Sequence, residues 1–168
     1  LDGRNNSKID LIRFNLKIIN AIGDIQTNDY TYEDHESSQR FLERLFTPNE
    51  TITASEFVFS RRVYKEKEGF VNYPLAWFSD YSTWLNFAEN SGIFNVTSAS
   101  VFWRLSKINI SSKTANLYEI GQKTKSLFMF ITFVDKNYKV EKSIKKKFIH
   151  NQLNYLFSYV KLINMCQI

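Results

Sequence analysis

The stretch "IRFNLKI" (residues 12–18) decides the fold class that this sequence predicts. Its apolar residues Ile12, Phe14, Leu16 and Ile18 alternate strictly with polar ones. This is a period of two, whereas an amphipathic helix repeats its apolar residues every three or four positions. The stretch is therefore predicted to be a strand, and the chain to be rich in strands.

Length and composition favour one folded domain over residues 1–168. Hydrophobic residues make up 43% of the chain and aromatic residues 16%, which is enough for a sizeable core. Two separate halves would each have a marginal core. The net charge of +5 favours phosphate or sialylated surfaces without requiring either.

The sequence carries no catalytic or cofactor signature. The motifs HExxH, GxSxG, GxGxxG, CxxC and the Walker loop are absent, and His35 and His150 belong to no motif. The single cysteine, Cys166, excludes an internal disulfide and a cysteine-rich metal site. No apolar run reaches the length of a membrane span. We therefore expect a protein that is not an enzyme and that needs no cofactor.

An acidic stretch is the one candidate for a metal site. Its carboxylates could gather calcium or magnesium, because hard cations prefer several oxygen ligands. Their spacing matches no known metal-binding loop, so no metal is predicted. The stretch contains Asp24, Asp29, Glu33, Asp34 and Glu36.

Three segments have helical periodicity. Residues 34–48 are predicted to form a helix capped by Asp34, with a Glu36–Arg40 pair, and residues 80–92 a second short helix. From Ser143 the apolar residues step by four and three, which predicts a long C-terminal helix packed on the sheet.

Further strands are expected from alternating or continuous apolar runs. Residues 55–64 and 70–78 are predicted to form a hairpin, and a meander is predicted to follow, with a bulge near Ser106 or Lys107. The strands of the meander are 100–110, 115–120 and 126–134, the last of them central. The fold class is thus predicted to be α+β, with an antiparallel sheet of about six strands against the C-terminal helix and two shorter helices in connections.

Aromatic residues concentrate in "NYPLAWFSDYSTW" (residues 72–84). An exposed ring stacks on the C–H face of a sugar while nearby polar groups orient its hydroxyls. Core packing is the alternative role for the same rings. The first functional hypothesis is recognition of cell-surface carbohydrate through an aromatic platform, with Tyr73, Trp77, Tyr81, Trp84 and Trp103 as ligand-binding residues.

Nucleic-acid binding is the second hypothesis. Cations interleaved with aromatic residues on a sheet face are typical of single-strand binders, although the RNP consensus is missing. The residues proposed for this role are Arg61, Arg62, Lys123, Lys125, Lys145, Lys146 and Lys147.

Four Asn-x-Ser/Thr triplets begin at Asn5, Asn49, Asn95 and Asn109. A chain so rich in Asn, Ser and Thr has roughly two or three such triplets by chance. Glycosylation is therefore only weakly indicated.

The opening "LDG" (Leu1, Asp2 and Gly3) resembles the start of the protease-resistant head domain of the rotavirus outer-capsid spike. Length and composition also suit such a head. The C-terminal helix departs from the galectin-like heads of that family, so no glycan-contacting residue carries over. The resemblance implies a receptor-binding domain on the virion surface that recognises cell-surface glycans and is not an enzyme.

Overall fold

The computed structural model describes residues 9–26, 32–47, 51–105 and 116–165, the last seven of these by their backbone alone. The chain forms two compact units, each built from segments that are distant in sequence. The prediction of a single domain stays a prediction. The sheet unit comprises Leu1–Phe41, Thr51–Phe70 and Trp84–Leu105, and the helical unit comprises Leu42–Glu50, Val71–Thr83 and Ser106–Ile168.

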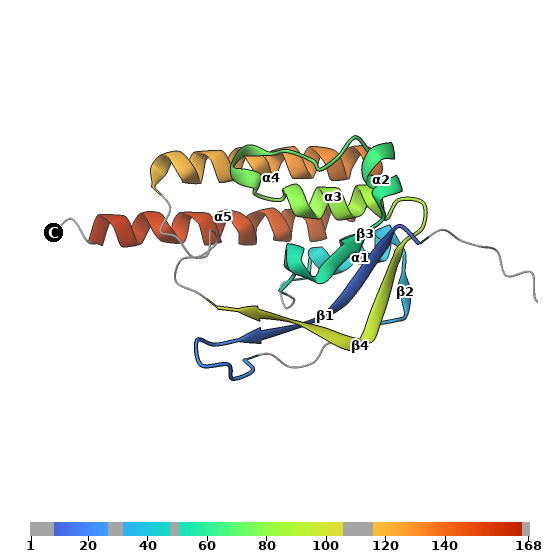
Figure 1. The fold of residues 1–168 in the computed structure, drawn as a ribbon. Helices are drawn as coiled ribbons and strands as arrows, with labels where there is room; N and C mark the ends of the chain where they lie inside the picture. Colours follow the sequence, from blue (N-terminus) through green and yellow to red (C-terminus); the bar gives the residue numbers. More distant parts are fainter. Residues whose placement is uncertain (1–8, 27–31, 48–50, 106–115, 166–168) are drawn as a thin grey trace, which may run out of the picture. The chain divides into compact units, whose positions relative to one another are not determined.

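The sheet unit confirms the strand that was predicted from residues 12–18. Strand β1 (Leu11–Ile19) lies beside β4 (Ile93–Arg104) in a four-stranded sheet of order β2-β4-β1-β3 (Figure 1). β1 pairs in parallel with β4 and antiparallel with β3 (Phe57–Phe59), while β2 (His35–Glu36) pairs antiparallel with β4. The α+β class is confirmed, but six antiparallel strands are wrong, because the sheet that the described residues form is mixed and has four strands.

Strand β4 carries an irregularity opposite the middle of β1. The register steps from Phe14 opposite Val96 to Asn15 opposite Ser100, so residues 97–99 have no partner on β1. The Asn15 side chain donates a hydrogen bond to the Thr97 carbonyl at 3.0 Å. The predicted bulge near Ser106 or Lys107 lies outside the described residues.

The hairpin predicted over residues 55–78 is wrong. A short 3-10 helix, η1 (Ala54–Glu56), precedes β3, and Ser60 then caps helix α2 (Arg61–Glu66) by accepting a hydrogen bond from the Val63 N–H at 3.1 Å. The cap satisfies a free N–H at the helix start and turns the chain out of the extended conformation. The second predicted strand contains the 3-10 turn η2 (Pro74–Ala76).

Two predicted strands, 115–120 and 126–134, belong to one helix, α4 (Leu117–Asn137). The Asn116 side chain caps α4 by accepting a hydrogen bond from the Glu119 N–H at 2.8 Å. The buried residues repeat every three, four or seven positions along α4, which is helical spacing. They include Ile120, Leu127, Phe130, Ile131 and Val134.

Three predicted helices are confirmed: α1 (Ser38–Leu45), α3 (Ser79–Phe87) and the long C-terminal helix α5 (Lys142–Met165). Ser37 rather than Asp34 precedes α1 as the cap, because its hydroxyl accepts a hydrogen bond from the Arg40 N–H at 3.1 Å. Helices α4 and α5 run side by side in opposite directions (Figure 1). Packing of α5 on the sheet stays a prediction.

Within the described ranges, no helix combines the length and the apolar character that crossing a membrane requires.

Candidate functional site

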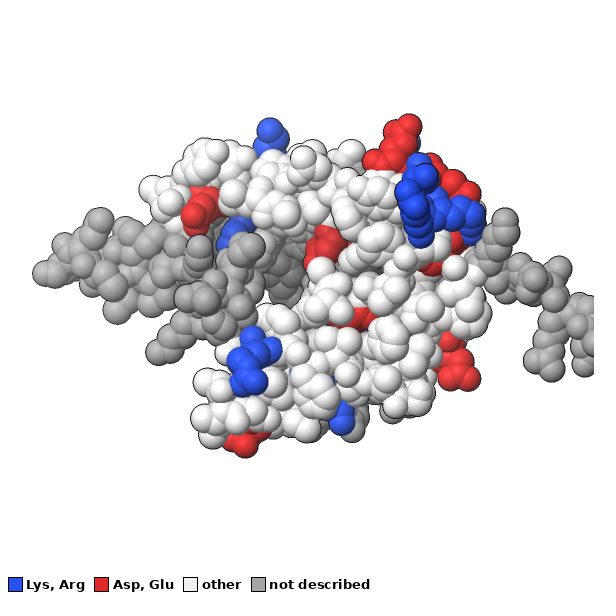
Figure 2. Space-filling model, in the orientation of Figure 1, with Lys and Arg blue, Asp and Glu red and all other residues white. Residues whose placement is uncertain are grey.

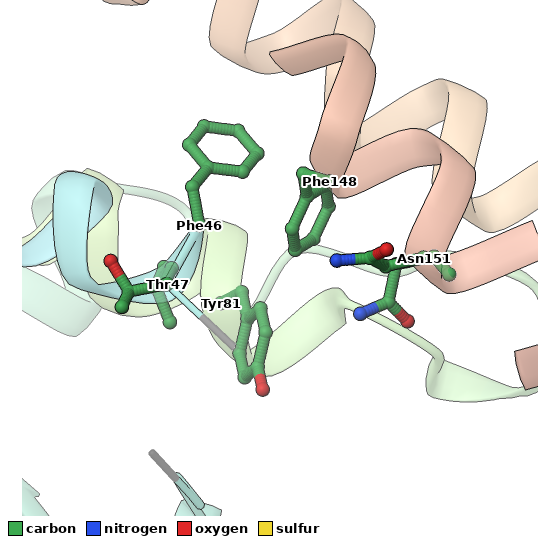
Figure 3. Close-up of a pocket in the computed structure, with 7 residues that line it drawn as sticks. Phe46, Thr47, Tyr81, Phe148 and Asn151 are labelled. Carbon is green, nitrogen blue, oxygen red and sulfur yellow. The ribbon is translucent and has the colours of Figure 1, made fainter. Parts of the chain in front are cut away.

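A pocket in the helical unit has a volume of about 110 Å³ (Figure 3). Three separate segments line it: the end of α1 with the residues after it, the first half of α3, and the second and third turns of α5. The lining residues are Leu45, Phe46, Thr47, Tyr81, Phe148, Asn151 and Gln152.

Packed aromatic rings form the inner wall of the pocket. Phe46 and Phe148 meet edge to face, with ring centroids 4.4 Å apart at an interplanar angle of 81°. Behind them, Phe78 stacks on Phe130 at 5.1 Å and 3°. Tyr81 contacts Phe78 edge to face at 5.6 Å. Edge-to-face and stacked contacts of this kind are the favoured geometries of aromatic pairs and stabilise the packing of this wall.

Polar side chains form the outer part of the pocket. Asn151 is exposed and Gln152 is half-buried. Thr47 is fixed by a hydrogen bond that its hydroxyl donates to the Glu43 carbonyl at 3.1 Å. Each amide offers two donors and an acceptor, and no side chain that lines the pocket is charged. The pocket can therefore bind a neutral group that carries both hydroxyls and an apolar face.

The residue before Tyr81 helps to fix the start of α3. The Asp80 carboxylate accepts a hydrogen bond from the Tyr81 N–H at 2.9 Å. Burial raises the pKa of Asp80, and this backbone hydrogen bond opposes the rise. Burial thus acts against the charged form of a carboxyl group that neighbours the pocket.

The five predicted ligand-binding aromatics do not share one unit. Tyr73, Trp77 and Tyr81 belong to the helical unit, and Trp84 and Trp103 to the sheet unit. Tyr73 and Trp84 are only 8% and 3% exposed, so neither presents a ring face to a ligand. Of the five, Tyr81 alone lines the pocket.

The buried position of Tyr73 has its own hydrogen bonds. Its hydroxyl accepts a hydrogen bond from Ser82 at 3.0 Å, and its N–H donates to the Ser79 hydroxyl at 2.9 Å. Burial raises the pKa of the Tyr73 hydroxyl, and the hydrogen bond with Ser82 opposes this. Tyr73 thus holds the start of α3 in place and does not face solvent.

Trp77 is half-buried and contacts a lysine. The Lys123 ammonium lies 4.4 Å from the centroid of the Trp77 ring, in a cation–π contact. Lys123 is itself buried, and this burial lowers its pKa, which the charge of Glu119 partly restores. Lys123 was predicted to bind nucleic acid, but its position beneath Trp77 removes it from the surface.

The other predicted nucleic-acid residues do not lie on a sheet face, so that part of the second hypothesis is wrong. Arg61 and Arg62 lie in α2, where Arg62 forms ion pairs with Asp10 and Glu66. In Figure 2, blue and red side chains are interspersed over α2. Lys125 lies in α4, and Lys145, Lys146 and Lys147 lie in α5.

Sequence reasoning missed a buried charge cluster in the sheet unit. Arg13 and Glu56 are fully buried, and the Arg13 Nε donates to the Glu56 Oε2 at 2.9 Å. The guanidinium also donates to the Tyr32 hydroxyl at 3.1 Å and lies 4.0 Å from the Glu36 carboxylate. Arg13 occupies a polar position of an alternating strand, which had indicated a solvent-facing side chain.

The two histidines and Asn95, the asparagine of the one described glycosylation triplet, each lie within hydrogen-bond distance of another residue. The His35 Nε2 lies 2.7 Å from the Ser91 carbonyl, and the His150 Nε2 lies 2.9 Å from the Asn154 amide. Asn95 is buried and donates to the Glu33 carbonyl at 2.8 Å, so its amide is not accessible to glycosylation in the folded chain. Asn5, Asn49, Asn109 and Cys166 lie outside the described residues.

The described part of the chain contains no cluster of three or more His, Cys, Asp or Glu residues that could hold a metal ion. Of the predicted acidic stretch, Asp29 lies outside the described residues. Glu36 instead belongs to the Arg13 cluster.

Six of the seven pocket residues were not predicted to bind a ligand: Leu45, Phe46, Thr47, Phe148, Asn151 and Gln152. Asn151 and Gln152 follow the lysine-rich start of α5. The change from charged lysines to neutral amides on this helix is a sequence feature that could have indicated them. Comparisons of the chain with protein-family models, with curated proteins and with solved structures find no match, so the pocket itself must carry the functional argument.

Proposed function

We propose that this protein recognises carbohydrate, without catalysis, through the pocket of the helical unit. One observation carries the proposal: the rings of Tyr81 and Phe148 lie in the same pocket as the amides of Asn151 and Gln152. Sugars present apolar C–H faces and rings of hydroxyls, and such sites combine aromatic surface with a few polar groups.

The size of the pocket supports recognition of one sugar or part of one sugar. A volume of about 110 Å³ is small beside the sites that enclose whole drug-sized ligands, which span roughly 300–1,000 Å³. The remainder of an oligosaccharide would lie on the surface beside α5. Affinity for a single site of this kind is expected to be modest, because little apolar surface is buried.

A passive role is supported by the chemistry of the lining. Apart from Tyr81, its polar groups are amides and a hydroxyl, which bind ligands but do not act as general acids or bases near neutral pH. The rotavirus-like start, Leu1 to Gly3, lies outside the described residues. Attachment to cell-surface glycans from a virion therefore remains a prediction of that resemblance.

A glycan array probed with the purified chain tests the proposal, followed by calorimetric titration with the best-binding oligosaccharide. The substitutions Tyr81→Leu and Asn151→Ala should each weaken binding by about tenfold or more, because each removes a contact in the pocket. Matched controls are Tyr118→Leu, an exposed tyrosine of α4, and Asn154→Ala, an exposed asparagine of α5 outside the lining. Equal loss in the pocket and control variants would contradict the proposal.

A further inference from the structure

Most of the net charge of the chain is concentrated in one short segment of the helical unit. Residues 135–147 contain six lysines and two acids, a net charge of +4 out of the chain's +5. The segment covers the end of α4, the connection after it and the first two turns of α5. We call it the lysine corner.

Four of the six lysines of the corner have no ion pair among the described residues. Lys145 forms an ion pair with Asp135 at 2.5 Å. Lys136, Lys142, Lys146 and Lys147 are exposed and form no ion pair with any residue that the structure describes. Four like charges without partners repel one another, so an anion bound among them would gain from each.

The position of these lysines on α5 is unfavourable for the helix itself. Lys142, Lys145, Lys146 and Lys147 lie in the first two turns of α5, and its first turn contains no acidic residue. The N-terminal end of a helix carries partial positive charge, so anionic groups are favoured there and cations are disfavoured. The arrangement therefore does not serve helix stability, and it adds to the local attraction for anions.

Lys147 places one end of the lysine corner beside the pocket. Phe148 lines the pocket and directly follows Lys147. Lys147 also lies four positions before Asn151, so the two side chains are neighbours on one stripe of α5, about 6 Å apart along its axis. A ligand that places a sugar between Tyr81 and Asn151 would thus extend next to Lys147.

We propose that the ligand of the pocket is an anionic polysaccharide, with one sugar in the pocket and its sulfate or carboxylate groups on Lys147 and the other exposed lysines of the corner. This inference rests on the proposed carbohydrate function and adds the chemical class of the carbohydrate. The neutral lining selects the sugar, and the lysine corner supplies most of the attraction for a charged chain. Binding should therefore weaken steeply as salt increases, because a polyanion releases its counterions when lysines replace them.

The test measures affinity for three probes at several salt concentrations: a heparin hexasaccharide, a neutral oligosaccharide of the same length, and a single-stranded DNA with the same number of charges. The variants are Lys146→Gln/Lys147→Gln for the corner and Tyr81→Leu for the pocket. Lys65→Gln/Lys125→Gln is the matched control, because it removes two exposed lysines that lie elsewhere. Circular dichroism checks that each variant is folded.

We expect the heparin hexasaccharide to bind at least tenfold more tightly than the neutral probe. The corner variant and the pocket variant should each weaken its binding by about tenfold, and the control by less than about twofold. The slope of log affinity against log salt should become shallower by about one unit for each corner lysine that contacts the ligand.

Three results would overturn the inference, and they differ in what they leave standing. Equal binding of the neutral and sulfated probes, unchanged by the corner variant, would refute the anionic ligand while the carbohydrate function stands. Binding of DNA that matches or exceeds that of the hexasaccharide, unchanged by Tyr81→Leu, would indicate a nucleic-acid surface and refute both proposals. Absence of binding to either oligosaccharide and to the glycan array would refute the carbohydrate function and this inference with it.

Discussion

The Arg13 Nε lies 2.9 Å from the Glu56 Oε2, and neither side chain has any exposed surface. Glu56 also accepts a hydrogen bond from the Thr53 N–H at 2.5 Å, so its carboxylate links β1 to the start of η1. The guanidinium lies 4.2 Å from the centroid of the Tyr32 ring. A buried charge pair of this kind contributes less through its attraction than its members would cost if they were separated.

Replacement of Arg13 by methionine should destabilise the protein by roughly 3–5 kcal/mol, because the Glu56 carboxylate would stay buried without its cation. Urea denaturation measures this effect. The double variant Arg13→Met/Glu56→Gln should recover part of the loss, since it removes both charges. Arg61→Met, at an exposed position of α2, is the control and should change stability by less than about 0.5 kcal/mol. A single variant as stable as the control would show that the pair is not needed.

Gly92 is expected to tolerate no side chain. Its φ angle is +68°, and a Cβ atom at this position would lie 2.5 Å from the Glu36 carbonyl oxygen and 2.6 Å from the His35 Nε2. The left-handed conformation alone costs a residue with a side chain about 1–2 kcal/mol. Gly92→Ala should therefore lower the free energy of unfolding by about 2 kcal/mol or more, which thermal or urea denaturation would detect.

Gly121 provides the matched control for Gly92. It lies inside α4, and apart from its chain neighbours and the nearby backbone of its own helix no atom lies within 4 Å of the position that its Cβ would occupy. Alanine favours a helix over glycine by roughly 0.5–1 kcal/mol. Gly121→Ala should thus raise stability while Gly92→Ala lowers it. The same sign for both variants would contradict the argument from backbone conformation.

The elements that sequence predicted correctly are those with a single clear period. β1 alternates strictly, and α5 steps by four and three, so each pattern fits one element type. The run from Leu127 to Ile131 is apolar at every position and fits a buried strand and a buried helix equally well. The signal that separated them was the cap: Asn116 followed three positions later by Glu119 indicates a helix start.

The pairing of the strands and the formation of the pocket depend on contacts between residues far apart in the chain, which a local sequence pattern does not reveal. The parallel pairing of β1 with β4 joins segments separated by most of the sheet unit. Tyr81 was predicted from a local concentration of aromatic residues. Its partners Phe148 and Asn151 come from a helix much later in the chain, so the sequence could suggest one wall of the pocket and not the other.

Asp80 should make stability fall as pH rises above the range in which an ordinary aspartate ionises. Burial raises its pKa in the folded chain, so the folded state holds a proton that the unfolded state, with a pKa near 3.8, has already released. The free energy of unfolding therefore decreases as the pH rises from 3.8 to the pKa that Asp80 has in the folded chain. Asp80→Asn keeps an oxygen acceptor for the Tyr81 N–H and removes the ionisation. It should remove that decrease in urea denaturation series at different pH, whereas Asp135→Asn, at an exposed site, should leave it in place.

Lys123 should make the free energy of unfolding rise with pH at the alkaline end of the pH range. Burial lowers its pKa in the folded chain, while the unfolded chain keeps the proton up to a pKa near 10.5. Between these two values the unfolded state binds more protons, so the free energy of unfolding rises with pH. Lys123→Met keeps an unbranched side chain against Trp77 and removes the charge. Its stability should exceed that of the parent chain at neutral pH, and the alkaline rise should disappear.

Lys125→Met is the control for Lys123, because Lys125 is exposed on the same helix. It should leave both the neutral stability and the alkaline rise unchanged. If instead Lys123→Met were less stable at neutral pH and the parent chain showed no alkaline rise, the cation–π contact with Trp77 would outweigh the cost of burying the ammonium. The pH dependence separates the two cases, since only a lysine that burial disfavours in its charged form links unfolding to proton uptake at alkaline pH.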